Sequence, residues 1–341
     1  MLDVLTIGDA TYDIFIKPDA HNTRKGVITT NSYPNDGSFC FPVGSKIPVT
    51  EADFRIGGSA ANVAVGLSRL GLETGVCTGL GEDNFAENIE SGLNNENVSI
   101  DLVKRNRLNK TNFGVIIRGD KDRTVLVYHG MKDYSKLPLP SKPEAKWLYV
   151  SALGNGYEKI LSKITALRAE NDVKLAFNPG SVQLDDYKSI GSILRVTDIL
   201  FVNYEEAVLA SDWRGPKPSI KHLLSALITK GVKNVVITLG REGEAATNGT
   251  DYYQANCVPA KRIEVTGAGD AMATGFLASV IHAEKENEEL SSSDLLKRSI
   301  LWGAIESASV IEKIGAQTNL LERNTLESQA KAIKHFTFSE I

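Results

Sequence analysis

A run of small residues followed by an acid is the strongest chemical signal in the sequence. Gly267, Ala268 and Gly269 precede Asp270, and the apolar spacing after Asp270 predicts a helix that begins at this point. Small side chains let backbone N–H groups approach a ligand, and a helix start offers free N–H donors and partial positive charge. The run is therefore a candidate phosphate-binding turn. Asp270 is either a first-turn helix cap or a base that accepts a proton from an alcohol beside the phosphate.

Other glycine-rich phosphate sites fit this run less well. A dinucleotide-binding fingerprint needs glycine at position 272, where Met272 stands, and it should follow the first strand of a βαβ unit. The sequence also has no Gly-x-x-x-x-Gly-Lys-Ser/Thr loop. An NAD-dependent dehydrogenase and a Walker-type nucleotide site are therefore disfavoured.

A second glycine-led helix is predicted nearer the N-terminus. Gly57 and Gly58 precede a helical pattern over 60–70, and Asn62 falls in the first turn. The amide of Asn62 offers an acceptor and donor hydrogens, which suit the adjacent hydroxyls of a polyol. The competing interpretation is close packing of a helix on a sheet, with Asn62 as a cap.

Strand and helix patterns alternate along most of the chain. Strands are predicted at 4–8, 74–80, 146–150, 174–177, 199–202 and 234–239. With helical patterns between them, they predict an α/β fold with a doubly wound, mainly parallel sheet covered by helices on both faces. Two β-rich segments, about 11–55 and 100–130, are expected to form a small lid sheet over a ligand cleft. We expect a single domain over residues 1–341.

Composition excludes several classes of function. The net charge of −4 over 341 residues gives no basic field for nucleic acid. The three cysteines are too few and too scattered for a disulfide framework or a zinc site, and the five histidines lack ligand spacing. No run of about 18 apolar residues and no signal-peptide pattern occurs, so we expect no membrane partner and a cytoplasmic location.

The two glycine-led helices, taken together, resemble the ribokinase-like family of sugar and nucleoside kinases, also called the PfkB family. The stretches 57–71 and 265–276 look like its N-terminal and C-terminal signatures. Weaker motifs resembling those of the family follow in the expected order at 8–13, 203–206, 238–243 and 308–316. The resemblance covers nearly the whole chain and implies a ribokinase-like α/β fold with a small β-sheet lid.

What the resemblance implies is an ATP-dependent carbohydrate kinase that phosphorylates an alcohol group. Asp270 would be the base, and the backbone of Gly267–Gly269 would form an anion hole for the transferred group. Nucleotide-binding residues would be Asn203, Glu206, Thr238, Gly240 and Gly243. Substrate-binding residues would be Asp13, Gly57, Gly58 and Asn62. Glu206 would also hold Mg²⁺, through water. In several members the lid makes a dimer, so we expect a homodimer.

Departures from the family pattern leave the substrate and one cofactor open. Glu264 stands where many members have Asp, and Val265 replaces a frequent Thr, in a region that forms a monovalent-cation site in some relatives. Dependence on K⁺ is therefore left open. Ser59 occupies a position that is often Lys in ribokinase-like and sugar-phosphate-like members. A sugar kinase is favoured, with a nucleoside kinase as the alternative. A non-catalytic ligand-binding regulator is disfavoured by the presence of Asp270.

Overall fold

The large domain is built on a single extended sheet. A computed structural model describes residues 1–19, 28–33, 36–41, 43–119 and 123–341. Within these residues, a ten-stranded sheet has the order β16-β15-β14-β13-β12-β11-β10-β1-β6-β7. Pairing is parallel from β13 to β7 and antiparallel from β13 to β16. The strands are β1 (Leu2–Ile7), β6 (Thr74–Leu80), β7 (Ser99–Arg105), β10 (Ala145–Val150), β11 (Lys174–Phe177), β12 (Ile199–Asn203), β13 (Asn234–Thr238), β14 (Glu244–Thr247), β15 (Tyr252–Ala255) and β16 (Phe338–Glu340).

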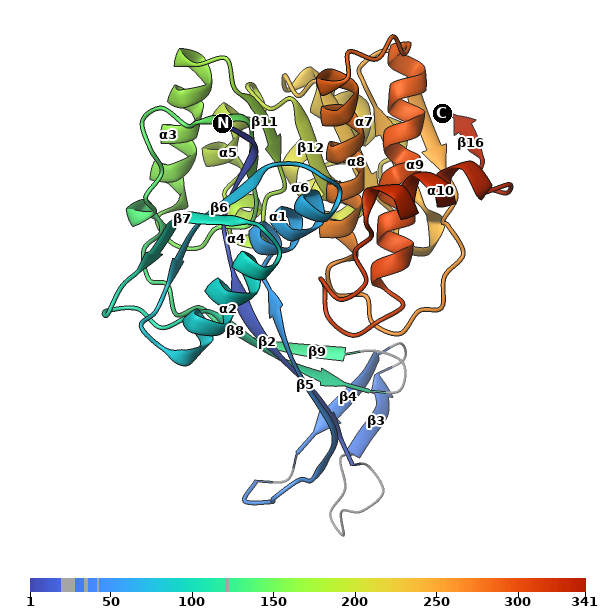
Figure 1. The fold of residues 1–341 in the computed structure, drawn as a ribbon. Coiled ribbons are helices and arrows are strands. Elements are labelled where there is room, and N and C mark those ends of the chain that lie inside the picture. Colours follow the sequence, from blue (N-terminus) through green and yellow to red (C-terminus); the bar gives the residue numbers. More distant parts are fainter. Residues whose placement is uncertain (20–27, 34–35, 42, 120–122) are drawn as a thin grey trace.

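Helices cover both faces of this sheet (Figure 1). They are α1 (Ser59–Arg69), α2 (Asn84–Asn95), α3 (Tyr157–Glu170), α4 (Ser181–Asp185), α5 (Tyr187–Leu194), α6 (Tyr204–Ser211), α7 (Ile220–Thr229), α8 (Ala268–Lys285), α9 (Ser292–Val310) and α10 (Arg323–Ala332). Alternate residues of the central strands enter different cores: Leu5 belongs to the core that includes residues of α3, α5, α6 and α7, whereas Val4 belongs to the core that includes residues of α1, α8, α9 and α10. Burial on both faces explains why these strands are almost wholly apolar. The predicted doubly wound α/β fold is confirmed.

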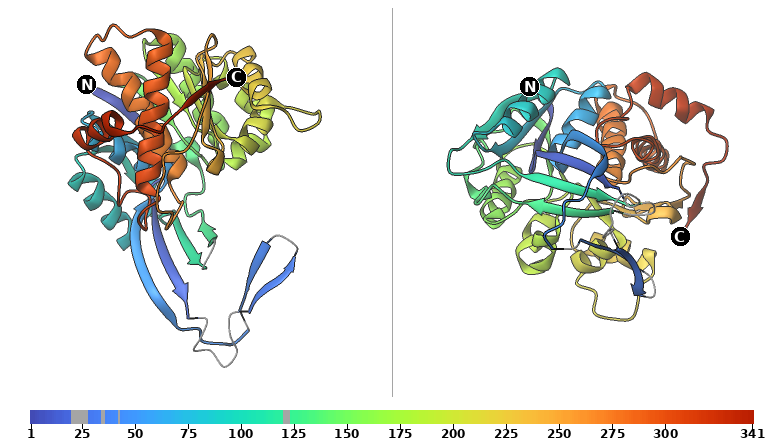
Figure 2. Two further views of the ribbon diagram at one scale, coloured as in Figure 1. Left: turned by 90° about the vertical axis from the view of Figure 1, so that its right-hand side faces the viewer. Right: turned by 90° about the horizontal axis from the view of Figure 1, so that it is seen from below.

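A second, smaller sheet projects from one end of the large domain (Figures 1 and 2). Its order is β5-β2-β8-β9, with bounds β2 (Thr11–Pro18), β5 (Val49–Gly57), β8 (Phe113–Arg118) and β9 (Arg123–Tyr128). We call these four strands the lid. Strands β3 (Ile28–Tyr33) and β4 (Asp36–Cys40) form a separate hairpin farther out. Of the segments predicted for the lid, 17–50 and the turn after residue 118 lie partly outside the described residues, and β7 belongs to the large sheet.

The register of the lid decides which side chains face the large domain. Asp13 lies opposite Arg55 on β5 and Gly114 on β8, and Gly114 lies opposite Val127 on β9. Cross-strand neighbours share a face, so these four residues form one row on the same side of the lid. Among the described residues, no helix combines the length and the apolar character needed to cross a bilayer.

Candidate active site

The predicted site residues gather where the parallel strands end and the lid begins. In a doubly wound sheet, ligands bind beyond the carboxyl ends of the strands. Here β1 runs into Asp9, β12 ends at Asn203 and β13 ends at Thr238. The starts of α1 and α8 lie beside each other, because Asn62 near the start of α1 is hydrogen-bonded to Asp270 in the first turn of α8.

The start of α8 provides a backbone site with open space beside it. Gly267 is the N-terminal cap, in the left-handed conformation with φ 84° and ψ 1°. A Cβ at this position would also collide with Ala316, so both the backbone conformation and the lack of space require glycine here. A Cβ on Gly269, by contrast, would meet nothing within 4 Å. The first turn therefore exposes helix-start N–H groups to a space that a phosphoryl group can enter.

Asp270 is held by residues far away in the sequence. Asn62 Nδ2 donates a hydrogen bond of 2.8 Å to Asp270 Oδ2, and Gln317 Nε2 donates one of 3.0 Å to Asn62 Oδ1. Burial raises the pKa of Asp270, and hydrogen bonds from Asn62 and Ser59 oppose that rise. Gln317, which the sequence analysis missed, fixes which end of the Asn62 amide faces the carboxylate.

Asp13 lies on lid strand β2, and its carboxylate is held in a tight space. Its Oδ1 accepts a 2.9 Å hydrogen bond from Thr11 Oγ1. A Cβ at Gly57 would collide with the Asp13 carboxylate, and one at Gly114 would lie 3.0 Å from Oδ1. The two glycines thus make the space that the carboxylate occupies. Burial raises the pKa of Asp13 to about 6, a value to which the negative charge of Asp270 also contributes. The two carboxylates therefore lie near enough for their charges to interact.

Gly58 has a structural part in bringing α1 to the cleft. Its φ is 90°, and a Cβ there would lie 2.5 Å from the carbonyl oxygen of Asp9. Any other residue would push the start of α1 away from the segment that enters the lid. Asn62, one turn later, is only 4% exposed. The Asn62 side chain thus contacts Asp270 and Gln317, and the polyol contact stays a prediction.

A buried polar cluster that no sequence pattern predicted joins the lid to the large domain. Asn112 Nδ2 donates to Asp9 Oδ1 and to Tyr134 Oη, both at 3.0 Å. Asn112 Oδ1 accepts from the backbone N–H groups of Gly130 and Met131, at 2.7 and 2.9 Å. Tyr134 Oη also donates to Asp9 Oδ1. This cluster connects the chain segments that enter and leave the lid, and it fixes the base of β2 on which Asp13 lies.

The nucleotide side of the predicted site borders a cavity of about 840 Å³. Asn203, Thr238 and Gly240 line it. Gly243 does not; it is buried with φ 90°, and a Cβ there would collide with the carbonyl oxygen of Ala255. Gly243 therefore shapes the turn between β13 and β14.

Asn203 and Glu206 form a reciprocal cap at the start of α6. The Glu206 backbone N–H donates to Asn203 Oδ1, and the Asn203 backbone N–H donates to Glu206 Oε2, both at 2.8 Å. This is the capping-box geometry that the sequence also allowed. Burial raises the pKa of Glu206, and the charges of Glu205 and Asp270 add to the rise. Glu206 is thus a helix cap whose buried carboxylate lies near enough to Asp270 to respond to its charge, but it does not line the 840 Å³ cavity.

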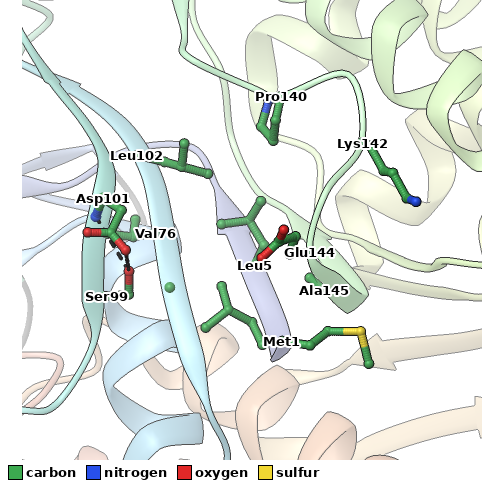
Figure 3. A pocket seen from close by; sticks show the side chains of 12 residues that line it. Met1, Leu5, Val76, Ser99, Asp101, Leu102, Pro140, Lys142, Glu144 and Ala145 are labelled. Atoms are coloured by element: carbon green, nitrogen blue, oxygen red, sulfur yellow. Dashed lines mark hydrogen bonds between the residues drawn. The ribbon is translucent and has the colours of Figure 1, made fainter.

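A second pocket, of about 400 Å³, lies at the opposite end of the strands (Figure 3). Residues at the starts of β1, β6, β7 and β10 line it, including Leu2, Gly75, Ser99 and Ala145. Figure 3 shows apolar side chains such as Leu5 and Leu102 in this pocket. None of the predicted site residues borders it, so this pocket is separate from the cleft.

Comparison with known proteins identifies the family and the fold. Residues 26–323 match the family described as pfkB family carbohydrate kinase. An ATP-dependent 6-phosphofructokinase of Thermoanaerobacterium thermosaccharolyticum is 23% identical over 288 residues, which cover 80% of this chain and 84% of the relative. The crystal structure of a nucleoside kinase from Methanocaldococcus jannaschii has a TM-score of 0.76 and 22% identity, covering 97% of this chain and 99% of that one.

A ribokinase from Thermotoga maritima has the same fold. Its TM-score is 0.75 at 20% identity, and the match covers 97% of this chain and all of that one, at 100%. The family match, over residues 26–323, covers most of the 341-residue sequence. The chain therefore belongs to the pfkB family of carbohydrate kinases, which are ATP-dependent phosphotransferases acting on sugars and nucleosides.

Proposed function

We propose that this protein transfers the γ-phosphoryl group of ATP to an alcohol group of a sugar-like substrate, with Asp270 as the general base. The observation that carries the proposal is the position of Asp270. Its carboxylate lies in the first turn of α8, oriented by Asn62, next to the open backbone at Gly269. A base and a phosphoryl-binding backbone therefore lie side by side.

In the proposed reaction, the alcohol oxygen forms a bond to the γ-phosphorus while the bond from that phosphorus to the bridging oxygen of ADP breaks. The alcohol proton passes to the Asp270 carboxylate, and ADP leaves with the bridging oxygen. Negative charge that develops on the transferred group meets the backbone N–H groups of Gly267–Gly269 and the positive end of α8. Positioning and charge stabilisation, rather than covalent participation of the protein, provide the catalysis.

The acceptor is proposed to lie between the lid and α1. Asp13 would accept hydrogen bonds from substrate hydroxyls, while Gly57 and Gly58 allow the lid and α1 to approach closely enough. Asn62 Nδ2 already serves Asp270, so its remaining hydrogen is available to a substrate oxygen.

We propose that the acceptor is uncharged. Asp13 and Asp270 both face the cleft, and an anionic substrate would be repelled there. The arginines on this side of the lid already pair with carboxylates: Arg55 with Asp53 at 2.8 Å, Arg118 with Glu51 at 2.9 Å and Arg123 with Glu264 at 3.1 Å. Sugar phosphates and sugar acids are therefore expected to be poor substrates.

ATP and Mg²⁺ are proposed to lie on the side of the 840 Å³ cavity. Asn203, Thr238 and Gly240 would border the phosphates. No group of three or more acidic, His or Cys ligands occurs among the described residues, which suits Mg²⁺, since this ion keeps several waters and binds through one or two carboxylates plus phosphates. Glu206 would hold it through water. Bound Mg²⁺ would neutralise phosphate charge. We assign no K⁺ ion, because Glu264 faces the Arg123 guanidinium.

A nucleoside kinase is the second candidate, and one feature of the lid favours it. Val127 lies in the same cross-strand row as Asp13 and is 57% exposed. An apolar side chain beside a hydroxyl-binding carboxylate suits a substrate that joins a ribose to a nucleobase. We also propose a cytoplasmic location, since the donor is ATP, and a homodimer formed through the lid.

The test is a screen for ADP release with Mg²⁺ over neutral sugars, nucleosides, sugar phosphates and sugar acids. With the best acceptor, Asp270→Asn is expected to lower turnover by at least about 100-fold. Its ATP affinity, measured by calorimetry, and its melting temperature should be nearly unchanged. Asp294→Asn is a matched control, because Asp294 lies in the first turn of the neighbouring helix α9. Turnover that survives in Asp270→Asn would remove Asp270 from the role of base.

A further inference from the structure

One ion pair connects the lid to the turn that leads into α8. Arg123, the first residue of β9, places its Nε 3.1 Å from Oε1 of Glu264. The Arg123 side chain is 25% exposed and that of Glu264 only 4%. In Figure 1, the start of β9 lies just below the loops that precede α8 and follow α9. A lid side chain therefore reaches a buried carboxylate of the large domain.

The Glu264 carboxylate also shapes its own turn. Its Oε1 accepts hydrogen bonds from the backbone N–H groups of Val265 and Thr266, at 2.9 and 3.0 Å, and from Thr266 Oγ1 at 2.9 Å. The backbone N–H of Glu264 donates to the carbonyl oxygen of Ile311 at 3.1 Å. Gly267, the cap of α8, follows directly. The carboxylate thus holds Val265 and Thr266, the two residues that lead into the proposed anion hole.

The burial of Glu264 makes its cation important. A carboxylate removed from water is costly unless an opposite charge accompanies it, and removing one partner of a buried pair leaves the other uncompensated. The cation here belongs to the lid, and the lid must move for an acceptor to enter beneath it. Whenever the lid swings away, Glu264 loses the guanidinium, and the turn at 264–266 loses part of what stabilises it.

We propose that Arg123 is a positioning residue that couples closure of the lid to the geometry of the anion hole. The proposal rests on the kinase function proposed above. With the lid closed, Arg123 neutralises Glu264, and the turn presents the backbone of Gly267–Gly269 in its working arrangement. With the lid open, the turn relaxes, and transfer from ATP to water is restrained until an acceptor is enclosed.

The experiment compares Arg123→Gln, Glu264→Gln and the double variant. Glutamine at 264 keeps an oxygen that can accept from Val265 and Thr266 but removes the charge. Arg118→Gln is the matched control, since Arg118 lies opposite Arg123 in the β8–β9 register and pairs with Glu51 inside the lid. Each single variant is expected to lower kcat by roughly 10-fold with little change in KM for the acceptor. The kcat of the double variant should be no lower than that of the less active single variant. Arg118→Gln should resemble the unaltered protein.

Amide hydrogen exchange supplies a readout that does not depend on turnover. The N–H groups of Val265 and Thr266 are expected to exchange faster in Arg123→Gln than in the unaltered protein, and at an unchanged rate in Arg118→Gln. If the unaltered protein released no ADP with any acceptor, the kinase proposal would fail, while the exchange comparison would still test the coupling.

Several results would overturn the coupling. Losses that add in the double variant would show that Arg123 and Glu264 act separately. A rise in acceptor KM for Arg123→Gln, with normal behaviour of Glu264→Gln, would place Arg123 on the substrate instead. Unchanged exchange at Val265 and Thr266 would show that the turn does not respond to the lid.

Discussion

Asp13 and Asp270 carry negative charge into one cleft from two different parts of the chain. Burial raises the pKa of both, and for Asp13 the neighbouring charge of Asp270 adds to the effect. A hydroxyl-binding carboxylate and a base must both be deprotonated to work. Because their pKa values are raised, activity is expected to be lost at a pH closer to 7 than is usual for a site that depends on carboxylates.

We predict that kcat/KM for the acceptor falls as the pH drops through about 6, the pKa of Asp13. The stability of the fold changes with pH in the opposite direction: through Asp13, the free energy of unfolding falls as the pH rises. The pKa of Asp13 is higher in the folded chain than in the unfolded chain. Burial of Asp13 therefore lowers the free energy of unfolding little below pH 3.8, and the full loss is reached as the pH rises through about 6. Asp13→Asn should therefore raise acceptor KM by at least about 10-fold and make the protein more stable relative to the unaltered form at pH 8 than at pH 4. Denaturant titrations at both pH values and a pH profile of kcat/KM check this. A flat profile from pH 5 to 8 would contradict it.

At the scale of elements, two glycines at the start of α8 have different structural roles. Gly267 needs its left-handed φ of 84° and has no room for a Cβ beside Ala316. Gly269 has ordinary helical backbone and faces open space. The fold therefore requires glycine at 267, whereas glycine at 269 leaves room for a ligand.

We predict that Gly269→Ala leaves the melting temperature almost unchanged but lowers kcat by at least about 10-fold, because the methyl group crowds the phosphoryl group. Gly267→Ala should instead lower the free energy of unfolding by at least about 1 kcal/mol through strain and collision. Thermal melts and ADP-release kinetics separate the two effects. Normal kinetics in Gly269→Ala would argue against an anion hole at this turn.

The start of α6 allows the cap and the metal contact to be tested separately. Glutamine in place of Glu206 can still accept from the Asn203 backbone N–H, so the reciprocal cap survives. We predict that Glu206→Gln keeps the melting temperature within about 2 °C while the Mg²⁺ concentration for half-maximal activity rises by at least about 5-fold. Activity measured over a Mg²⁺ titration checks this. An unchanged Mg²⁺ requirement would leave Glu206 as a cap only.

At the scale of the whole molecule, the outer face of the lid exposes apolar side chains. Phe54 lies opposite Ile14, one residue along from the Asp13 row, and therefore faces away from the cleft. Leu126 shares that face, and the two side chains are 52% and 54% exposed. Apolar groups this exposed on a sheet are a usual sign of an interface.

We predict a homodimer that Leu126→Glu converts to a monomer, since a buried charge without a partner would oppose association. Light scattering after size-exclusion chromatography measures the mass of each form. Leu108→Glu is the control, because Leu108 is 87% exposed but lies between β7 and β8, outside the lid sheet. A monomeric unaltered protein, or a dimer that survives in Leu126→Glu, would contradict a lid-mediated dimer.

Local chemistry explains what could be predicted from the sequence. The apolar runs of the central strands, the helical spacing of α1 and the Gly-Ala-Gly-Asp start of α8 each follow from neighbouring residues, and the structure places these elements as expected. The sequence also allowed a capping box at Asn203 and Glu206, because that pattern spans only four positions. The roles of individual glycines were harder to predict from the sequence. Gly243 was expected at the nucleotide, and the structure adds that it lets the turn between β13 and β14 approach Ala255 closely.

The sequence alone therefore determined the parallel sheet, the glycine-rich start of α8 and the acid in its first turn, since propensity and periodicity act over a few residues. Only the tertiary structure decided what surrounds that acid. Gln317 reaches Asn62 across 255 positions, Asn112 reaches Asp9 across 103, and Arg123 reaches Glu264 from the lid. These contacts depend on where strands and loops come to lie after the core has formed, and single polar residues far apart leave no periodic pattern that could predict them.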